Sequence, residues 1–151
     1  MKNPNVLTAF EAATKLLTAR DRTSAELRSR LVRKGFASTA VEQAVVRAIE
    51  LGYLDDTRTA KALAERWFAA GAPRALVDQK LRDAGTPTAL AEAILRTAPP
   101  ERTQAQIALH RRFGERIPTP QKAARFLAGR GFDPDLIGEL LGGLSEGRLG
   151  D

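Results

Sequence analysis

The sequence predicts an all-α fold made of three tandem three-helix repeats that stack on one another. Apolar residues such as Leu27 and Leu31 recur three or four positions apart along most of the chain, which is the spacing of an amphipathic helix rather than of a strand. A leucine is followed four residues later by a glycine at three places, 31–35, 81–85 and 127–131. Because the three glycines are 50 and 46 residues apart, they indicate an internal repeat of about three helices per copy.

The register of this repeat extends to four apolar columns. Counted from the three glycines, the columns lie 22 and 18 residues before and 6 and 10 residues after. Their members are Ala13, Leu63 and Leu109; Leu17, Trp67 and Phe113; Val41, Ala91 and Ile137; and Val45, Leu95 and Leu141. Because a column repeated three times is typical of a core, we expect Trp67 to pack inside the protein rather than to offer a stacking surface for bases.

The boundaries of the repeats follow from this register. One copy alone is too small for a good core, so neighbouring copies are expected to stack. We therefore place the three repeats at 9–54, 55–98 and 99–144. Residues 1–5 and 145–151 are short, polar segments at the ends of the chain, and we expect them to fray.

Helix starts and ends are marked by capping residues and glycines. Thr23 and Glu26 have the capping-box spacing, in which a hydroxyl and a carboxylate bind free backbone N–H groups, and so do Thr39 and Glu42. Two further starts, with a capping side chain directly before a proline, are Thr119-Pro120 and Asp133-Pro134. The glycines that we expect to end helices are Gly35, Gly52, Gly71, Gly85 and Gly131.

The stretch GYLDD, residues 52–56, joins the first repeat to the second. We expect Gly52 to end a helix, and Tyr53 and Leu54 to supply apolar surface at the joint. Asp55 and Asp56 then open the next helix, where carboxylates bind free N–H groups and meet the positive end of the helix dipole. A metal site or acid–base chemistry would need further converging ligands or a nearby histidine, and a surface epitope is the remaining alternative.

Composition excludes several function classes. The chain of 151 residues has no cysteine, and hence no disulfide and no thiolate metal site. No segment approaches the roughly 20 apolar residues of a membrane-spanning helix, and nothing near the start resembles a signal peptide. We therefore expect a soluble, cytoplasmic protein without membrane contact. The only histidine, His110, has no partner at catalytic spacing, and no phosphate-binding glycine loop is present, so we expect no enzyme activity and no cofactor.

The positive charge is concentrated near the N-terminus. Of the net charge of +6, residues 1–54 contribute +4, with nine Lys/Arg against five Asp/Glu. An excess of this kind suits an anionic partner such as DNA, RNA or an acidic protein surface. The predicted third helices, STAVEQAVVRAIE and PTALAEAILR, consist mainly of alanine, aliphatic residues and glutamate, which favours packing over base reading. Weak binding to a DNA backbone stays open.

Four cations around the second predicted helix form a candidate partner-binding face. Arg30 and Arg33 fall on the side of the helix opposite its apolar residues, Arg22 precedes the helix, and Lys34 ends it. These groups could meet phosphates or an acidic protein. The alternative is an ordinary solvated surface, because Glu26 lies four residues before Arg30 and the two can form a helix-surface ion pair.

In three stretches the chain resembles the RecX regulatory proteins, which are bacterial modulators of the RecA recombinase. The stretches are TSAELRSRLVRKGF (23–36), AIELGYLDDTRTA (48–60) and GAPRALVDQKL (71–81), and the resemblance covers about residues 8–144. The positions that match the family motifs are Glu26, Leu27, Leu31, Lys34 and Gly35; Gly52, Tyr53, Leu54, Asp55, Asp56 and Arg58; and Gly71, Pro73 and Arg74. One departure is Thr59, which stands where the family commonly has phenylalanine.

The resemblance implies both a shape and a function. The family's three tandem repeats form an elongated, curved, solenoid-like molecule. Its members are non-enzymatic regulators that bind RecA and the RecA–DNA filament, limit filament extension, and inhibit RecA ATPase, strand exchange and coprotease activities, which places them in DNA repair, recombination and the SOS response. We expect a monomer that binds RecA through the four cations above, joined by Arg58 and Arg74. The alternative is an all-helical nucleic-acid-binding module, or a scaffold, that acts independently of RecA.

Overall fold

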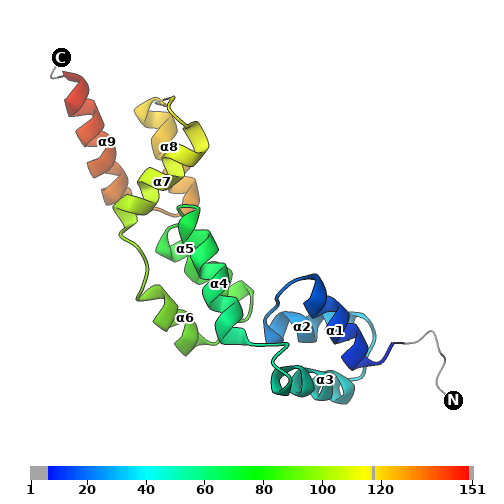
Figure 1. The fold of residues 1–151 in the computed structure, drawn as a ribbon. Helices are drawn as coiled ribbons and strands as arrows, with labels where there is room; N and C mark the ends of the chain where they lie inside the picture. The colour runs from blue at the N-terminus through cyan, green and yellow to red at the C-terminus, as the bar shows by residue number, and fades with distance from the viewer. Residues whose placement is uncertain (1–6, 117, 150–151) are drawn as a thin grey trace. The chain divides into compact units, whose positions relative to one another are not determined.

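The computed structural model describes residues 7–116 and 118–149, and it describes side-chain burial up to residue 142. Over these residues the chain forms nine α-helices and no strand (Figure 1). The helices are α1 Ala9–Ala19, α2 Ser24–Arg33, α3 Ser38–Glu50, α4 Asp56–Ala69, α5 Arg74–Asp83, α6 Thr88–Leu95, α7 Glu101–Phe113, α8 Pro120–Arg130 and α9 Pro134–Leu149.

The predicted all-α fold class is confirmed, and the helices follow the predicted repeats three at a time. Helices α1–α3 lie within 9–54, α4–α6 lie within 55–98, and α7–α9 begin within 99–144. Helix α9 continues to Leu149, so its backbone is helical in part of the expected C-terminal tail, where Leu, Glu and Arg favour a helix. The expected tail at 1–5 lies outside the described residues. The repeat boundaries themselves stay a prediction.

The chain divides into two compact units. The first unit holds the residues up to 62 together with 81–91, and the second holds 63–80 together with the residues from 92 on. The division falls inside α4, α5 and α6. The helices of the middle repeat therefore contribute to both units.

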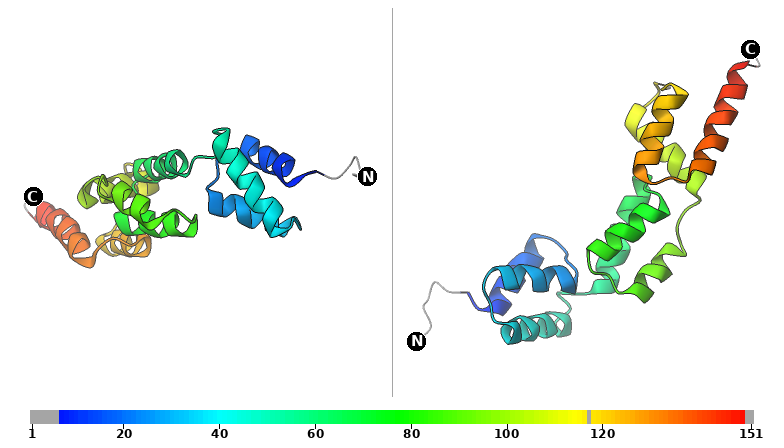
Figure 2. Two further views of the ribbon diagram at one scale, coloured as in Figure 1. Left: turned by 90° about the horizontal axis from the view of Figure 1, so that it is seen from below. Right: turned by 180° about the vertical axis from the view of Figure 1, so that it is seen from behind.

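Helices α1, α2 and α3 pack against one another in the first unit (Figures 1 and 2). Leu27 and Leu31 of α2 and Val45 of α3 are fully buried between the three helices. Helix α1 contributes Ala12 and Ala13 to the same core. Because alanine side chains are short, they let the backbone of α1 approach its neighbours closely.

Helices α7, α8 and α9 form a bundle in the second unit (Figure 2). Ala105 of α7 and Leu127 of α8 are fully buried, and Ile137 of α9 is nearly so. The rings of Phe113 and Phe126 meet edge to face, with centroids 5.5 Å apart and an interplanar angle of 77°. Such a pair stabilises a fold by about 0.5–1.5 kcal/mol beyond its buried area.

Two of the four predicted apolar columns are buried in all three repeats. Their members are Val41, Ala91 and Ile137, and Val45, Leu95 and Leu141. The column that contains Trp67 is only half-buried, so the prediction that Trp67 lies in the core is wrong. The Nζ atom of Lys80 lies 5.4 Å from the centre of the Trp67 ring, which therefore presents a face to a cation.

Ile49 is a second difference from the sequence pattern. It continues the four-residue spacing of Val41 and Val45, which is typical of an apolar helix face, whereas its side chain is 50% exposed. The reason lies in the helical period, because Ala44, Val45 and Ala48 occupy the inward positions and Ile49 falls just outside them. The outer face of α3 therefore carries the apolar side chain of Ile49 among its polar residues.

The capping predictions are confirmed at three helix starts and wrong at one. The hydroxyl of Thr23 accepts from the Glu26 N–H while the Glu26 carboxylate accepts from the Thr23 N–H. Thr119 caps α8, and the Asp133 carboxylate accepts from the Asp135 N–H at the start of α9. Helix α3, in contrast, begins at Ser38 without a side-chain cap, because its N-cap is Ala37 and Thr39 already lies inside the helix, while Glu42 binds Arg28. A further capping box, Thr8 with Glu11, opens α1.

The repeated leucine and glycine occupy equivalent positions. Leu31, Leu81 and Leu127 are fully buried, and the glycines four residues later have φ angles of 94°, 76° and 99° at Gly35, Gly85 and Gly131. Gly85 is further constrained by its surroundings, because a Cβ atom at this position would overlap the Cβ atom of Ala25. Glycine is thus required at Gly85 both for its backbone conformation and for the close approach of α2.

A first joint, made by Thr23, Ser24, Asp56 and Ala84, ties the start of α2 to later segments of the first unit. The Ser24 N–H donates to the Asp56 Oδ1 atom at 2.6 Å, so the first residue of α4 binds a free N–H group of α2. The hydroxyl of Thr23 donates to the Ala84 carbonyl in the turn after α5. Both contacts satisfy groups that would otherwise be buried without a partner.

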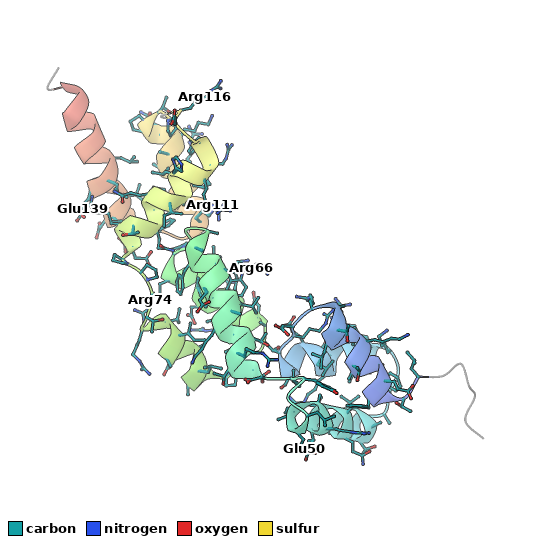
Figure 3. All side chains as sticks on the ribbon, viewed as in Figure 1. Glu50, Arg66, Arg74, Arg111, Arg116 and Glu139 are labelled. Carbon is teal, nitrogen blue, oxygen red and sulfur yellow. The ribbon has the colours of Figure 1, made fainter. Side chains whose placement is uncertain are left out.

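A second joint, made by Phe68, Ala72, Arg74, Glu101 and Gln104, lies in the second unit. Arg74, which is labelled in Figure 3, is the first residue of α5. Its N–H donates to the Glu101 Oε1 atom at 3.0 Å. The buried Gln104 amide of α7 donates to the carbonyls of Phe68 at 2.7 Å and Ala72 at 3.0 Å. Helix α7 therefore supplies partners both for the start of α5 and for the end of α4.

Candidate partner-binding site

The GYLDD stretch builds the passage from α3 to α4. Gly52 has a φ of 75° and ends α3, and Leu54 is buried in the core of the first bundle. Asp55 Oδ1 accepts from the Arg58 N–H at 3.0 Å, which caps α4. Tyr53 is 49% exposed and borders a shallow hollow beside α1. With Asp56 bound to α2, both carboxylates of this stretch have backbone partners.

Arg30 and Arg33 line a shared hollow on the first unit. The hollow is open to solvent, has a volume of about 580 Å³, and also receives Arg20 and Ser29. Arg30 and Arg33 lie three residues apart on α2, so their side chains project from the same side of the helix. The structure thus brings two of the predicted cations together and adds Arg20, which the sequence interpretation did not include.

The ion pairs of this hollow leave two guanidinium groups free. Arg20 Nη2 lies 3.5 Å from Glu26 Oε2, and the other oxygen of Glu26 accepts from Thr23. The helix-surface pair between Glu26 and Arg30, which the sequence left open as an alternative, is absent. Within residues 7–116 and 118–142, neither Arg30 nor Arg33 has an ion-pair partner, although the Asp83 carboxylate also borders the hollow.

Arg22 does not lie on the exposed surface. Its side chain is 7% exposed, and its Nε atom donates to the Leu16 carbonyl near the end of α1 at 3.3 Å. Burial lowers the pKa of Arg22 first, and the positive charges of Arg20 and Arg30 lower it further, against the opposing effect of Glu26. Since a guanidinium stays charged throughout the physiological range, Arg22 adds positive charge behind the hollow without touching a partner there.

The remaining predicted cations lie elsewhere. Lys34 borders a different cleft, between α1 and the turn from α2 to α3. Arg58 is exposed in the first turn of α4. Arg74 is exposed at the start of α5 and belongs to the second compact unit. Among the five predicted partner-binding residues of the first unit, Arg30 and Arg33 border one hollow and Lys34 borders another.

Groups with catalytic potential are dispersed in the part of the chain that the structure describes. His110 is exposed on α7, next to Arg111 and Arg112. No three His, Asp or Glu side chains converge there as ligands for a metal ion. None of the helices in that part is long and apolar enough to cross a membrane.

Sequence reasoning missed the hollow and the cleft because both depend on packing between segments. Arg20 precedes α2 and gave no helical-wheel signal, although it stands near the other cations in the chain. The cleft beside Lys34 combines Lys15 and Phe36, which are 21 positions apart and share no motif. The clustering of positive charge in residues 1–54 and the exposed side predicted for Arg30 and Arg33 pointed to this region.

Comparisons with known proteins identify the family. A family model described as "RecX, first three-helix domain" matches residues 9–47. Regulatory protein RecX of Trichlorobacter lovleyi is 37% identical over 141 residues, which cover 87% of this chain and 92% of that protein. Regulatory protein RecX of Xanthomonas oryzae pv. oryzae is 32% identical over 135 residues, which cover 86% of this chain and 84% of that protein.

A solved structure shares the fold. The crystal structure of RecX from Lactobacillus salivarius has a TM-score of 0.69 and 17% sequence identity to this chain, over 91% of this chain and 94% of that one. The low identity limits this likeness to the fold, whereas the sequence relatives extend over most of the chain at 30% identity or more. The chain therefore belongs to the RecX regulatory protein family.

Proposed function

We propose that this chain is a non-enzymatic regulator that binds the RecA recombinase and its filament on DNA. By limiting filament extension it inhibits the ATPase, strand-exchange and coprotease activities of RecA. Membership of the RecX family supports this proposal. The structural observation that carries it is the pair of unpaired guanidinium groups, Arg30 and Arg33, in one open hollow.

Arginine side chains in this setting suit a protein partner. A guanidinium presents several N–H donors in a planar fork that matches a carboxylate with two parallel hydrogen bonds. Arginine is also enriched among the residues that carry most of the binding energy at protein interfaces. Because Arg30 and Arg33 do not have to give up an internal ion pair, binding carboxylates of RecA would cost them little. Lys34 and Arg58 of the first unit and Arg74 of the second are proposed as further, separate contacts with RecA.

The test of the function is the rate of DNA-dependent ATP hydrolysis by RecA as the chain is titrated in, before and after filaments have formed. We expect inhibition in both orders of addition. Inhibition far below one copy per RecA would place the action at growing filament ends, whereas stoichiometric inhibition would place it along the filament. No inhibition by folded protein in either order would refute the proposal.

Charge reversal tests the proposed face. In the variant Arg30→Glu/Arg33→Glu we expect the half-inhibitory concentration to rise at least about tenfold, equivalent to about 1.4 kcal/mol of binding free energy. The melting temperature should stay unchanged, because both side chains are exposed and unpaired. The charge-matched control is Lys61→Glu/Arg96→Glu, at two exposed positions away from the hollow. Equal inhibition by the two variants would remove Arg30 and Arg33 from the interface.

An ionic-strength series separates RecA binding from independent binding to DNA. Contacts made only to phosphates weaken steeply with salt and need no recombinase. We expect the chain to bind RecA without DNA, and to bind a bare oligonucleotide more weakly. Tight, salt-sensitive binding to the oligonucleotide, together with no binding to RecA alone, would favour the nucleic-acid-binding alternative.

A further inference from the structure

A second concave surface lies on the first unit, apart from the arginine hollow. It is an open cleft of about 1080 Å³ between α1 and the turn that joins α2 to α3. Its apolar side chains include Leu7, Leu16, Ala19 and Phe36, and two lysines border it, Lys15 from α1 and Lys34 from the end of α2. None of the residues that border this cleft carries a negative charge.

The side chains of the two lysines have no partner among the residues that the structure describes. Over residues 7–116 and 118–142, neither ammonium group takes part in an ion pair or a hydrogen bond, and both residues are exposed. Lys15 and Lys34 come from different elements and yet border the same cleft. They place two positive charges beside an apolar floor, with no carboxylate there to neutralise them.

The apolar side chains of the cleft favour a ligand that has apolar groups as well as negative charge. Phe36 and Leu16 pack against the core of the first bundle from its edge and stay half-buried. Leu7 is 38% exposed at the border of the cleft. Covering such surface stabilises a complex in proportion to the apolar area removed from water, so the favoured ligand brings apolar side chains of its own.

We propose that this cleft is the docking site for an acidic peptide segment of a protein partner, in which one or two apolar side chains lie between carboxylates. The apolar side chains fill the cleft over Phe36 and Leu16 while the carboxylates meet Lys15 and Lys34. This inference rests on the proposed function, in which the partner is RecA. The acidic and apolar segment that binds here is then a segment of RecA. The cleft then adds a second contact to the arginine hollow.

Charge and shape favour a peptide over a nucleic-acid backbone. A phosphate chain would engage the two lysines but leave the apolar floor without a matching surface. The arginine hollow has the opposite character, with five of its eight bordering side chains charged. A partner protein can satisfy both surfaces with one polypeptide, since acidic and apolar side chains alternate freely in sequence.

The probe is a fluorescein-labelled synthetic 12-residue peptide with a central Leu-Phe pair flanked by Asp and Glu on both sides. Two matched peptides replace either the Leu-Phe pair by Ser-Ser or the acids by Lys. In fluorescence anisotropy we expect the first peptide to bind the full-length chain at least tenfold more tightly than either matched peptide. Equal binding by the Ser-Ser peptide, or no binding by the first peptide, would overturn the proposal.

Two variants of the chain test the two halves of the cleft. Lys15→Glu/Lys34→Glu reverses the charges, and Ala19→Trp fills the apolar part without changing charge; Ala19 is exposed, so the fold should tolerate it. Each should weaken binding of the first peptide at least tenfold. The control Lys61→Glu/Arg96→Glu has the same net charge as the lysine variant and should bind as the wild type does. Retained binding in both cleft variants would contradict the assignment.

Titration with RecA separates the two proposals. If the wild-type chain inhibits RecA ATPase and Lys15→Glu/Lys34→Glu needs at least tenfold more protein to do so, both proposals stand. Inhibition that is equal in the two proteins refutes the cleft and leaves the function intact. No inhibition by the wild type, with the acidic peptide still bound, refutes the function and leaves the cleft. Displacement of the peptide by oligo-dT, or by a second copy of the chain, would assign the cleft to that occupant instead.

Discussion

The first and second joints both provide an acceptor for a free helical N–H, but they use different residues. In both, the first N–H of a helix donates to a carboxylate at the start of a later helix, from Ser24 to Asp56 and from Arg74 to Glu101. Ser24 and Arg74 are 50 residues apart, as are Gly35 and Gly85. Both joints thus provide an acceptor for the free N–H at the start of a helix, although the residues that form the hydrogen bond differ.

The joints differ at the end of the preceding helix. In the first unit the Leu16 carbonyl of α1 accepts from Arg22, which comes from the adjoining loop. In the second unit the carbonyls of Phe68 and Ala72 accept from Gln104, which comes from α7. The end of α1 is therefore satisfied locally, whereas the end of α4 depends on another helix. We infer that the second joint loses more stability than the first when one polar side chain is removed.

The largest expected effect concerns the glycines that the joints enclose. Gly85→Ala should lower the free energy of unfolding by about 2–5 kcal/mol, from a positive φ and an overlap with the Ala25 Cβ atom. Gly71→Ala should cost a similar amount, because its Cβ atom would lie 2.7 Å from the Ala108 backbone nitrogen. Urea unfolding measures both. Gly35→Ala is the control, with a positive φ and open space around it.

A second substitution separates the two glycines. Ala25→Gly should recover part of the stability lost in Gly85→Ala, because the clash there is with a side chain. No side-chain change can do the same for Gly71→Ala, where the obstacle is backbone. Failure of Ala25→Gly to restore any stability would show that conformational strain, rather than the close approach of α2, requires glycine at Gly85.

The polar side chains at the two joints provide the next test. Gln104→Leu removes the donor of two hydrogen bonds; the Ala72 carbonyl loses this partner, whereas the Phe68 carbonyl keeps the Gly71 N–H, and the loss should be about 1–3 kcal/mol. The corresponding residue of the first joint, three positions after its carboxylate, is Thr59, which is 2% exposed and makes no side-chain hydrogen bond within the described residues. Thr59→Val should therefore change stability by less than about 1 kcal/mol. Similar losses in the two variants would contradict the inferred difference.

A smaller loss than for Gln104→Leu is expected at the carboxylates. Asp56→Ala and Glu101→Ala each remove one acceptor for a helical N–H, and each should cost about 1–2 kcal/mol in thermal or chemical unfolding. Asp56→Asn and Glu101→Gln keep an acceptor oxygen and should recover more than half of the loss. If the Asn and Gln variants are as unstable as the Ala variants, the negative charge rather than the hydrogen bond matters.

Sequence alone predicted what depends on local spacing. The helical period and the capping box at Thr23 and Glu26 are confirmed, since both follow from neighbours along the chain. Thr39 and Glu42 have the same spacing, but α3 begins before Thr39, after the N-cap Ala37, and Glu42 binds Arg28 on another helix. Neither the start of the helix nor the tertiary contact follows from spacing alone.

The candidate site was predicted in part, for the same reason. Arg30 and Arg33 were correctly placed outside the apolar side of their helix, because a helical wheel decides that. Arg22 was predicted to contact a partner as well, but it is buried against the end of α1, where its Nε atom donates to the Leu16 carbonyl. Trp67 belongs to a predicted core column, but Leu17, Trp67 and Phe113 are all half-buried, so this column borders the core instead of filling it.

The hydrogen bond from the Thr23 hydroxyl to the Ala84 carbonyl can form only after much of the chain has been synthesised. The two residues are 61 positions apart, and α2 is among the first helices to leave the ribosome. At about 5–20 residues per second, roughly 3–12 s pass before Ala84 follows Thr23 out of the tunnel. The N-terminal helices can pack their own core during that interval, but over roughly its first half the start of α2 has neither Asp56 nor Ala84 in place, because Asp56 follows Thr23 by 33 positions. The earliest folding intermediate on the ribosome should therefore have a frayed α2, which a chain stalled just beyond α3 would reveal by hydrogen exchange.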